Sequence, residues 1–489
     1  MRLHSLLKYL DPNPSFDLIP DVSIAGIQED SRLVRSGDLF IARPGTKLDG
    51  TTFAIDAQAR GAVAIVTQSS IEGVTLPQII VKNAALSASK LANAFHGNPS
   101  HDLSLVGVTG TNGKTTVTYL IRHILAHVNK TCGMIGTVEI DDGARRVEAS
   151  MTTPSAIHVA ELLAAMKKNR CRGCAIETSS HALDQFRTDG ARFAGAGFTN
   201  LTGDHLDYHG TIERYAAAKA RLFTNLPADA VAAINVDDPH HETMIANCES
   251  RIVTFGIRRA ADYRAVDFAV SMHGTSYVLN SPDGKTEISL KMIGRHNIEN
   301  SLCAIALCCE VFGLSIHQAA GALRTALGAP GRLQPVSLGQ PFAVLVDYAH
   351  TDDALLNVLG ALKPLAKNRL RVVFGCGGDR DRTKRPRMAR VAEKFADVIY
   401  VTSDNPRTED PQSILAEIAS GFSIENTKRL VVESDRHKAI KQAISDAEAG
   451  DIVLIAGKGH ENYQIVGTTK QHFDDVEEAS RAITAWARA

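Results

Sequence analysis

The sequence predicts an α/β protein of several domains whose sheets are mostly parallel. Its 489 residues exceed the length that one hydrophobic core usually holds, which favours two to four domains. Apolar runs alternate with helical patterns over most of the chain, and this alternation is typical of parallel sheets. The alternation is most regular toward the C-terminus, where five apolar runs predict a doubly wound domain.

The first hundred residues predict a small α/β unit. Strand-like runs at 37–45 and 61–68 are separated by glycine and proline turns. A helical pattern at 85–97 follows, and Asn98, Pro99 and Ser100 form a plausible linker.

The middle of the chain begins with a strand, a glycine-rich loop and a helix at 103–125. Further strands are predicted at 173–180, 194–201 and 230–238, with helical patterns between them. A β-rich patch at 262–292 precedes a helix at 296–313, and the Gly- and Pro-rich segment 328–336 could join two domains.

The C-terminal part predicts five strands, at 342–350, 369–378, 397–404, 428–434 and 451–459. Polar and glycine-rich loops follow four of them, with the sequences DYAHTDD, GCGGDRD, SDNPRTE and GKGHE. Ligands of doubly wound domains bind at the carboxyl ends of the strands, so these loops predict the site.

Composition excludes several classes of protein. The formal net charge is −1 and the charged fraction is 22%, so no nucleic-acid-binding surface is indicated. The N-terminus has no signal-peptide pattern, and no apolar run is long enough to span a bilayer. The eight cysteines include one CxxC pair, Cys171 and Cys174, without a second pair at zinc-site spacing. Buried free thiols in a reducing, cytoplasmic compartment are the better interpretation.

The segment VGVTGTNGKTTVTYL, residues 106–120, resembles a phosphate-binding loop but has Val108 where the strict pattern requires glycine. Gly110 and Gly113 can still turn backbone N–H groups toward phosphate oxygens, and a helix beginning near Lys114 adds its dipole. Lys114 can reach the terminal phosphates, and the Thr115 hydroxyl can ligate Mg²⁺. The alternative is a glycine-rich turn that binds nothing.

A magnesium site needs further oxygen ligands. Glu177, at the end of a predicted strand, is the better candidate, and Asp237 is the second although an ordinary strand-end charge is favoured there. His205 in DHLDYHG could ligate a metal or lie in a solvated surface loop. Taken alone, the helical run ERYAAAKARLF predicts that Lys219 is a solvated lysine on a helix.

Ten motifs in order resemble those of the Mur ligases of peptidoglycan synthesis. They are TGTNGKTT, ETSSHALDQFR, FTNLTGDHLDYHGT, YAAAKARLF, GRHNIENSLCA, GAPGRLQ, VDYAHTDDAL, GCGGDRD, SDNPRTEDP and AGKGHE. The segments DSRLVRSGDLF and GTKLDGTTFA resemble the family's N-terminal domain, so the resemblance covers nearly the whole chain. In this family the residue at the position of Val108 need not be glycine.

The resemblance implies three domains: residues 1–100 for the UDP end of the substrate, 101–332 for ATP, and 333–489, Rossmann-like, for an amino acid. It implies a monomeric, ATP- and Mg²⁺-dependent amide ligase that adds meso-diaminopimelate to UDP-N-acetylmuramoyl-L-alanyl-D-glutamate. ATP would convert the γ-carboxylate of D-glutamate into an acyl phosphate, which an amine then attacks. Cations and backbone donors should dominate such a site.

The resemblance also assigns roles to individual residues. Lys114, Lys219 and His205 are expected to be catalytic, with Lys219 carbamylated so that it becomes an anionic oxygen ligand. The expected metal ligands are Thr115, Glu177, His205 and Lys219. The expected ATP contacts are Gly110, Thr111, Asn112, Gly113, Lys114, Thr115, Thr116, Asn297, Arg332 and Asp347. The expected contacts to the UDP substrate are Ser31, Thr152, Thr153, Ser179, Gln185 and Arg187.

The motif Asp404-Asn405-Pro406-Arg407 indicates which amino acid is added. Diaminopimelate carries a distal carboxylate and ammonium; arginine can bind the first, and acidic or amide oxygens can accept from the second. Arg380, Gly457 and Glu461 match the remaining contacts of the family.

Two residues depart from the family pattern: Asp352 replaces a proline, and Met151 replaces a residue that is often polar. The alternatives are another carboxylate–amine ligase, such as a folylpolyglutamate or cyanophycin synthetase, and a P-loop regulatory or motor ATPase.

Overall fold

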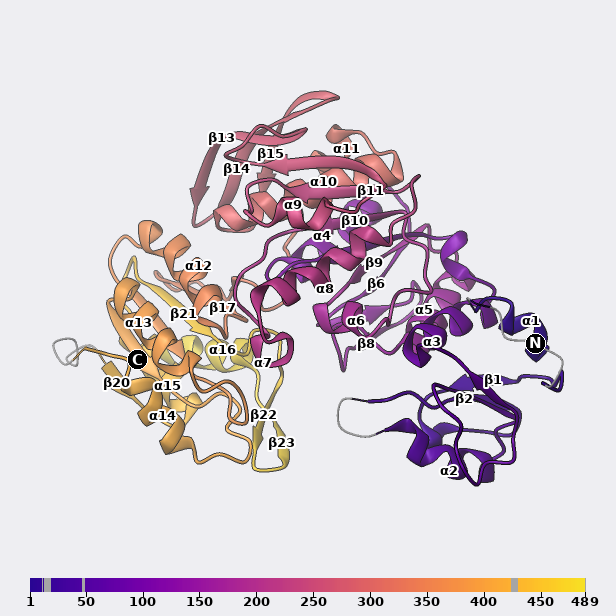
Figure 1. Cartoon of the computed structure of the whole chain (residues 1–489). Coiled ribbons are helices and arrows are strands. Elements are labelled where there is room, and N and C mark those ends of the chain that lie inside the picture. The colour runs from indigo at the N-terminus through magenta and orange to yellow at the C-terminus, as the bar shows by residue number, and fades with distance from the viewer. Residues whose placement is uncertain (11, 13–18, 46–48, 424–429, 489) are drawn as a thin grey trace. The chain divides into compact units, whose positions relative to one another are not determined.

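The computed structural model describes residues 1–10, 12, 19–45, 49–423 and 430–488. Residues 46–48 of the GTKLDGTTFA segment and residues 428 and 429 of the predicted strand 428–434 lie outside the described residues. Figure 1 labels the helices and strands along the chain. The described chain divides into two units. The first consists of Met1–Leu201, His209–Arg264 and Leu302–Ala319, and the second of Thr202–Tyr208, Ala265–Ser301 and Ala320–Ala489.

The N-terminal part of the first unit is built on a parallel four-stranded sheet of order β1-β2-β3-β4. Its strands are β1 (Gly26–Gln28), β2 (Asp38–Ile41), β3 (Ala64–Thr67) and β4 (Gln78–Ile80). Its helical elements are α1 (Leu3–Leu7), η1 (Ser31–Leu33), η2 (Gly50–Phe53), α2 (Ala54–Ala59), α3 (Ala84–Phe95) and η3 (Pro99–His101). Asn83 caps α3 by accepting from the Leu86 N–H, so the helix begins where the sequence changes from turn to alanine-rich.

The larger part of the first unit has the strand order β12-β11-β10-β5-β9-β6-β7-β8. The strands from β12 to β6 are parallel, as predicted, whereas β7 and β8 form an antiparallel edge. These strands are β5 (Ser104–Thr109), β6 (Cys132–Ile135), β7 (Glu139–Asp141), β8 (Arg146–Glu148), β9 (Gly173–Glu177), β10 (Gly195–Phe198), β11 (Val231–Asn235) and β12 (Arg251–Gly256).

The helices of this part connect the parallel strands. They are α4 (Lys114–His127), α5 (Ala156–Lys168), α6 (Ser180–Asp184), α8 (Ile212–Thr224) and α9 (His241–Ile245). Ile157 and Ala160 of α5 pack into the hydrophobic core of the N-terminal sheet, which joins the two parts of the first unit. Burial of these apolar faces supplies the main stabilisation of the helices.

The predicted β-rich patch consists of β13 (Tyr263–Ser271), β14 (Gly274–Ser281) and β15 (Gly284–Leu290). β13 begins in the first unit, where Tyr263 pairs with Phe255, and continues in the second. β14 and β15 form an antiparallel hairpin. The helices α10 (Arg295–Phe312) and α11 (Ile316–Leu323) follow, and α7 (Leu206–His209) is a short turn of helix in the DHLDYHG segment.

The rest of the second unit is the predicted doubly wound domain, with strand order β16-β17-β21-β18-β19-β20. All strands but β16 are parallel. The strands are β16 (Gln334–Pro335), β17 (Ala343–Asp347), β18 (Leu370–Phe374), β19 (Val398–Val401), β20 (Leu430–Val432) and β21 (Ile452–Ala456), with a separate hairpin of β22 (Tyr463–Val466) and β23 (Thr469–His472).

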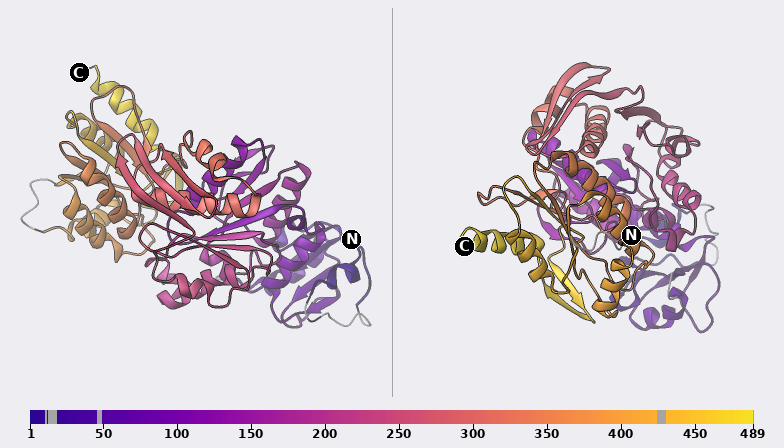
Figure 2. Two further views of the ribbon diagram at one scale, coloured as in Figure 1. Left: turned by 90° about the horizontal axis from the view of Figure 1, so that it is seen from above. Right: turned by 90° about the vertical axis from the view of Figure 1, so that its left-hand side faces the viewer.

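Helices cover both faces of this sheet (Figure 2). α12 (Asp352–Leu362), α13 (Lys384–Phe395) and α14 (Pro411–Ala419) share one hydrophobic core with it, whereas α15 (Arg436–Ser445) and α16 (Asp475–Trp486) share another. The turn η4 (Lys363–Leu365) follows α12. The loops after β17, β18, β19 and β21 therefore lie at one edge of the sheet, where the sequence predicted a site.

Among the described residues, no helix is both long and apolar enough to cross a membrane. All eight cysteines are free, and seven of them are buried, as the sequence predicted. Burial raises the pKa of Cys132 to about 12, so this thiol stays protonated and unreactive at neutral pH.

Candidate active site

The glycine-rich loop connects β5 to α4, and its geometry explains the departure at Val108. Val108 lies inside β5, its side chain is fully buried, and its carbonyl accepts from the Thr178 N–H. Gly110 has a φ of 148°, and a Cβ there would lie 1.9 Å from Thr199 Oγ1. Gly113, the N-cap of α4, has a φ of 90°. The loop thus requires glycine at 110 and 113, while position 108 belongs to the strand.

Two residues that follow β10 brace this loop. Asn200 accepts from the Asn112 N–H at 2.9 Å, and its carbonyl accepts from the Thr111 N–H at 2.8 Å. Thr199 Oγ1 donates to the Asn112 carbonyl at 2.6 Å. The sequence did not single out Thr199 and Asn200, although their place at the end of a strand next to β5 could have suggested this role.

Lys114 folds back over the loop that precedes it. Its ammonium donates to the carbonyls of Gly110 and Thr111, both at 2.9 Å. Lys114 begins α4, so its charge lies at the N-terminal end of a helix, where anions are favoured. The predicted phosphate-contacting lysine is therefore at the mouth of the loop.

Glu177 lies beside the loop because β9 pairs with β5, with Val108 and Glu177 in register. Its side chain is 1% exposed. Thr115 Oγ1 donates to Glu177 Oε2 at 2.9 Å, and Thr137 donates to the same carboxylate from its N–H at 2.8 Å and its hydroxyl at 3.0 Å. Thr137 is a participant that the sequence did not reveal, since no motif marks it.

Lys219 is buried, not solvated. Its side chain is 1% exposed, and its ammonium donates to the Gly110 carbonyl at 2.7 Å and lies 4.4 Å from the centre of the Tyr215 ring. The expectation of an ordinary solvated helix lysine is therefore wrong. α8 packs its inner face onto the sheet, and this packing places Lys219 beside the phosphate-binding loop.

The donor set suits a hard divalent cation. Thr115 and Glu177 offer hydroxyl and carboxylate oxygens 2.9 Å apart, at the end of the loop that would hold phosphates. Oxygen donors of this kind are those that Mg²⁺ prefers. Within the described ranges, no group of three or more His, Cys, Asp or Glu side chains could hold a metal. Asp237, the second candidate, instead accepts from the N–H groups of Ile257, Arg258 and Arg259.

The residues predicted to hold the muramoyl-dipeptide form a connected network next to Glu177. Thr153 Oγ1 donates to the Glu177 carbonyl at 2.6 Å and accepts from the Ser179 N–H at 3.1 Å. Arg187 donates to the Thr153 carbonyl at 2.6 Å and to Gln185 Oε1 at 2.8 Å.

Two neighbouring residues extend this set. The Thr152 hydroxyl lies 3.1 Å from the Thr137 hydroxyl, and Met151 lies at the surface with its sulfur 3.9 Å from Arg187. Ser31 lies in η1, in the N-terminal part of the same unit.

Three other predicted ATP or metal contacts belong to the second unit. Asp347 accepts from the N–H groups of Leu333 at 2.7 Å and Ala349 at 2.8 Å, and the guanidinium of the adjacent Arg332 lies 4.5 Å from the Tyr348 ring centre. Burial raises the pKa of Asp347 above its ordinary value. His205 is half exposed, with a φ of 54°.

Asn297 and Asp352 occupy helix ends in the second unit. Asn297 is buried in the first turn of α10, and its amide donates to the Ile293 carbonyl at 2.8 Å. Asp352 begins α12 and pairs with Arg387 at 2.9 Å, so the residue that replaces the family's proline is accommodated at a helix start.

A buried polar cluster forms where the loops after β19 and β21 meet. Asn405 donates to Glu461 Oε2 at 3.0 Å and accepts from the fully buried Lys458 at 3.2 Å. Asp404 is also buried; its Oδ1 makes no hydrogen bond and lies 3.5 Å from Lys458 Nζ. A Cβ on Gly457 would lie 3.0 Å from Asp404 Oδ2.

The cluster holds two carboxylates and one ammonium. Burial and the neighbouring Asp404 raise the pKa of Glu461 above its ordinary value. An additional ammonium would relieve this repulsion and give Asp404 Oδ1 the hydrogen bond that it lacks beside Lys458. The cluster is therefore a candidate site for a primary amine.

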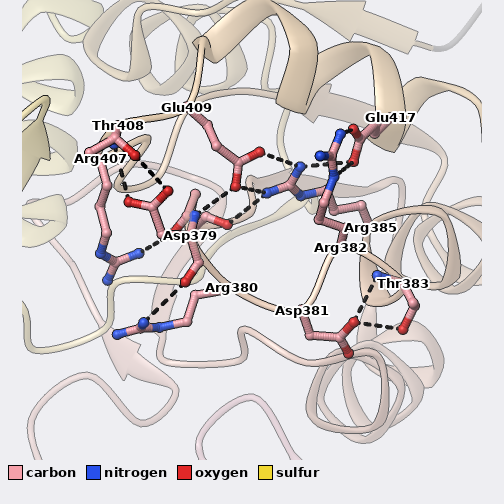
Figure 3. Close-up of polar contacts among 12 residues, drawn as sticks. Asp379, Arg380, Asp381, Arg382, Thr383, Arg385, Arg407, Thr408, Glu409 and Glu417 are labelled. Carbon is pink, nitrogen blue, oxygen red and sulfur yellow. Dashed lines mark hydrogen bonds and ion pairs between the residues drawn. The ribbon is translucent and has the colours of Figure 1, made fainter. Parts of the chain in front are cut away.

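Arg407 and Arg380 lie on neighbouring loops of the same sheet edge (Figure 3). Arg407 donates to the Gly378 carbonyl at 2.8 Å, and Arg380 is exposed, with a guanidinium nitrogen 3.2 Å from the Asp379 carbonyl. Both guanidinium groups can offer further N–H donors to a carboxylate.

Comparison with known proteins identifies the family of this chain. Residues 23–96 match the model described as Mur ligase family, catalytic domain; residues 108–308 match the Mur ligase middle domain; and residues 331–459 match the Mur ligase, glutamate ligase domain. The predicted limits at residues 100 and 332 stay predictions.

Curated relatives match over the full length. The UDP-N-acetylmuramoyl-L-alanyl-D-glutamate--2,6-diaminopimelate ligases of Gloeobacter violaceus and Geobacillus kaustophilus are each 43% identical to this chain. The first alignment covers 99% of the chain and 98% of the relative, and the second covers 99% of both.

Solved structures agree with this result. A structure of a UDP-N-acetylmuramoyl-L-alanyl-D-glutamate--2,6-diaminopimelate ligase is 35% identical, covers 99% of both chains and has a TM-score of 0.70. A MurF structure from Acinetobacter baumannii shares the fold, with a TM-score of 0.65 at 19% identity over 93% of this chain and 95% of that one. The three domain matches and the full-length relatives show that this chain belongs to the Mur ligase family.

Proposed function

We propose that this protein is the ATP-dependent ligase that joins meso-2,6-diaminopimelate to the D-glutamate γ-carboxylate of UDP-N-acetylmuramoyl-L-alanyl-D-glutamate. Full-length relatives at 43% identity carry this activity in their names. The observation that carries the choice of amino acid is the juxtaposition, at one sheet edge, of a buried acidic cluster and two guanidinium groups, that of the exposed Arg380 and that of the half-buried Arg407.

The glycine-rich loop would hold the phosphates of ATP. Gly110 and Gly113 give the backbone its tight turn, α4 begins directly after Gly113, and Lys114 is at the loop's mouth to contact the terminal phosphates. Arg332, Asp347 and Asn297 would contact the rest of the nucleotide.

Thr115 and Glu177 would hold Mg²⁺ through their oxygens, and His205 and a carbamylated Lys219 would complete the ligands of the metal centre. Bound magnesium would neutralise charge between the triphosphate and the substrate carboxylate. The residues of this chain must therefore keep Glu177 correctly oriented, which Thr137 does by donating two hydrogen bonds.

The chemistry requires an activated carboxylate, because a free carboxylate has no adequate leaving group. Transfer of the γ-phosphoryl group to the glutamate oxygen gives an acyl phosphate and ADP. The amine of diaminopimelate then attacks the carbonyl carbon, and the tetrahedral intermediate expels phosphate to leave the amide. Thr152, Thr153, Ser179, Gln185 and Arg187 would orient the muramoyl-dipeptide, with Ser31 contacting its UDP end.

The loop cluster of the second unit would select diaminopimelate. Asp404, Asn405 and Glu461, beside Gly457, would accept from the distal ammonium. Arg407 on the Pro406-stiffened loop, together with Arg380, would bind the distal carboxylate. L-Lysine has the distal ammonium but lacks that carboxylate.

Release of phosphate from ATP tests the proposal. We expect release only when UDP-N-acetylmuramoyl-L-alanyl-D-glutamate and meso-diaminopimelate are both present. Release with neither substrate would indicate a regulatory or motor ATPase, and release with a folate substrate would indicate the folylpolyglutamate alternative. The monomeric state and cytoplasmic location remain predictions, which size-exclusion chromatography and cell fractionation can test.

A further inference from the structure

The loops that carry Arg380 and Arg407 lie so close together that no side chain larger than the hydrogen of glycine fits at their contact. A Cβ on Gly378 would lie 1.9 Å from the Pro406 carbonyl oxygen, and a Cβ on Gly377 would lie 2.9 Å from Arg407 Nη1. The Gly378 N–H donates to the Asn405 carbonyl at 2.9 Å. The two loops are therefore in direct backbone contact.

Both loops also hold a residue in an unfavourable backbone conformation. Asp379 has a φ of 54° and Arg407 a φ of 52°, in the left-handed region that non-glycine residues rarely adopt. Such a conformation persists only where surrounding contacts impose it. For Arg407 these contacts are to the β22–β23 hairpin: its N–H donates to the Ile465 carbonyl at 3.1 Å, and its carbonyl accepts from the Gly467 N–H at 2.7 Å. For Asp379 they come from the loop that carries Arg407.

Glu409 makes the contact to the Asp379 backbone and also binds Arg385 (Figure 3). One carboxylate oxygen accepts from the Asp379 N–H at 2.6 Å. Both oxygens accept from Arg385, at 2.9 Å each. Arg385 in turn donates to the Gly377 carbonyl at 3.2 Å. Thr408, beside Glu409, adds a second connection by donating to Asp379 Oδ1 at 2.7 Å.

The pair of Arg385 and Glu409 is well suited to hold a fixed geometry. The Arg385 side chain is fully buried, and its fork meets Glu409 bidentately, which restricts both side chains. Hydrogen bonding from Arg385 lowers the pKa of Glu409 to about 2, so the carboxylate is ionised throughout the range of any assay. Arg385 is also contacted by Glu417, on α14, at 2.8 Å.

We propose that Glu409, acting through Arg385 and the Asp379 N–H, is a positioning residue that sets the spacing of Arg380 and Arg407 and thereby the affinity for the distal carboxylate of diaminopimelate. This inference rests on the proposed function. Glu409 itself need not touch the substrate, because its contacts are to the loops that present the two arginines.

The test compares Glu409→Gln with Glu417→Gln. Each variant removes one of the two carboxylates that accept from the buried Arg385. Only Glu409 also accepts from the Asp379 N–H and so holds the loop. For Glu409→Gln we expect the KM for meso-diaminopimelate to rise about tenfold or more, with the KM for ATP unchanged, since small displacements of positioning groups have large effects. For Glu417→Gln we expect both KM values to stay near those of the wild type.

Calorimetric binding of meso-diaminopimelate gives a second readout that is independent of turnover. Residual ligation of L-lysine, which lacks the distal carboxylate, should be the same in Glu409→Gln and the wild type. If Glu409 contributed only to stability, the substitution would affect the kinetics with every substrate alike. Equal KM values for diaminopimelate in the two variants would overturn the inference.

If Glu409→Gln does not fold, Thr408→Val decides the question at an exposed position, since it removes only the hydroxyl that contacts Asp379. A raised KM for diaminopimelate in Thr408→Val, restored in Thr408→Ser, supports the inference; unchanged values in both variants contradict it. Absence of diaminopimelate ligation by the wild type would instead reject the proposed function, so the two failures are distinguishable.

Discussion

Thr115 Oγ1 donates a hydrogen bond to Glu177 Oε2 at 2.9 Å, joining the first turn of α4 to the end of β9. Two segments that are 62 residues apart in the chain thus bring a hydroxyl and a carboxylate together beside the phosphate-binding loop. The pair is where the proposed magnesium site and the proposed ATP site meet.

We expect Thr115→Val to raise the magnesium concentration needed for half-maximal activity about tenfold or more, because it removes one proposed ligand and one donor to Glu177. Magnesium titration of the steady-state rate measures this effect. Thr118→Val is the matched control: Thr118 is buried on the same helix and donates to the Thr115 carbonyl at 2.9 Å. An equal shift in both variants would mean that the helix, not the hydroxyl of Thr115, determines the requirement.

Lys219→Ala should lower kcat about 100-fold or more, because loss of a proposed metal ligand, the carbamate on Lys219, would remove several kcal/mol of stabilisation from the transition state. Small carboxylic acids, such as acetate, should restore part of the rate by supplying the missing oxygens. A thermal unfolding measurement controls for the buried contact of Lys219 with Gly110. Full activity of the folded variant would exclude a role for Lys219 in the metal site.

Arg407→Lys should raise the KM for meso-diaminopimelate about 10- to 100-fold, since a lysine cannot reproduce a bidentate guanidinium–carboxylate contact. Steady-state kinetics at saturating ATP measure the change. Arg382→Lys, on the nearby loop and paired with Glu417, is the control and should leave this KM unchanged. An equal rise in the KM for ATP would show that Arg407 does not select the amino acid.

The affinity for diaminopimelate should fall as the pH falls through the raised pKa of Glu461, since protonation removes the charge that is proposed to accept from the distal ammonium. The KM measured from neutral to acidic pH should therefore rise with a midpoint above the ordinary glutamate value, 4.5. Glu461→Gln should have a higher KM that no longer shows this transition. A transition that persists in the variant would assign it to another group.

The same raised pKa predicts a stability effect. The folded-state pKa of Glu461 lies above its unfolded value, so its contribution to stability is fully present below the unfolded pKa and is lost as the pH rises through the folded pKa. Glu461→Gln should therefore be at least as stable as the wild type at neutral pH. Chemical denaturation at neutral and acidic pH tests this expectation.

The sequence predicted the architecture well because its strands are short apolar runs with clear polar ends. The five C-terminal strands lie close to their predicted places, and the parallel strands that flank the glycine-rich loop do as well. Each of these features is local: burial of a run and the turn residues that bound it are visible within about ten residues.

The structural features that the sequence could not reveal are those that depend on tertiary packing. Lys219 has an ordinary helical neighbourhood in the sequence, and only the packing of α8 shows that it is buried. Thr137 carries no motif, yet a chain reversal places it against Glu177. Glu409 follows the predicted DNPR motif by two positions, but its partner Arg385 lies 24 residues earlier.

The central claim is that this enzyme activates a carboxylate with ATP and delivers diaminopimelate to it. The most direct measurement is a panel assay with UDP-N-acetylmuramoyl-L-alanyl-D-glutamate, ATP and, in turn, meso-diaminopimelate, L-lysine or L-ornithine, with the product identified by mass spectrometry. We expect efficient formation of the UDP-tripeptide with meso-diaminopimelate and little product with the other two. Equal or better ligation of L-lysine would contradict the account.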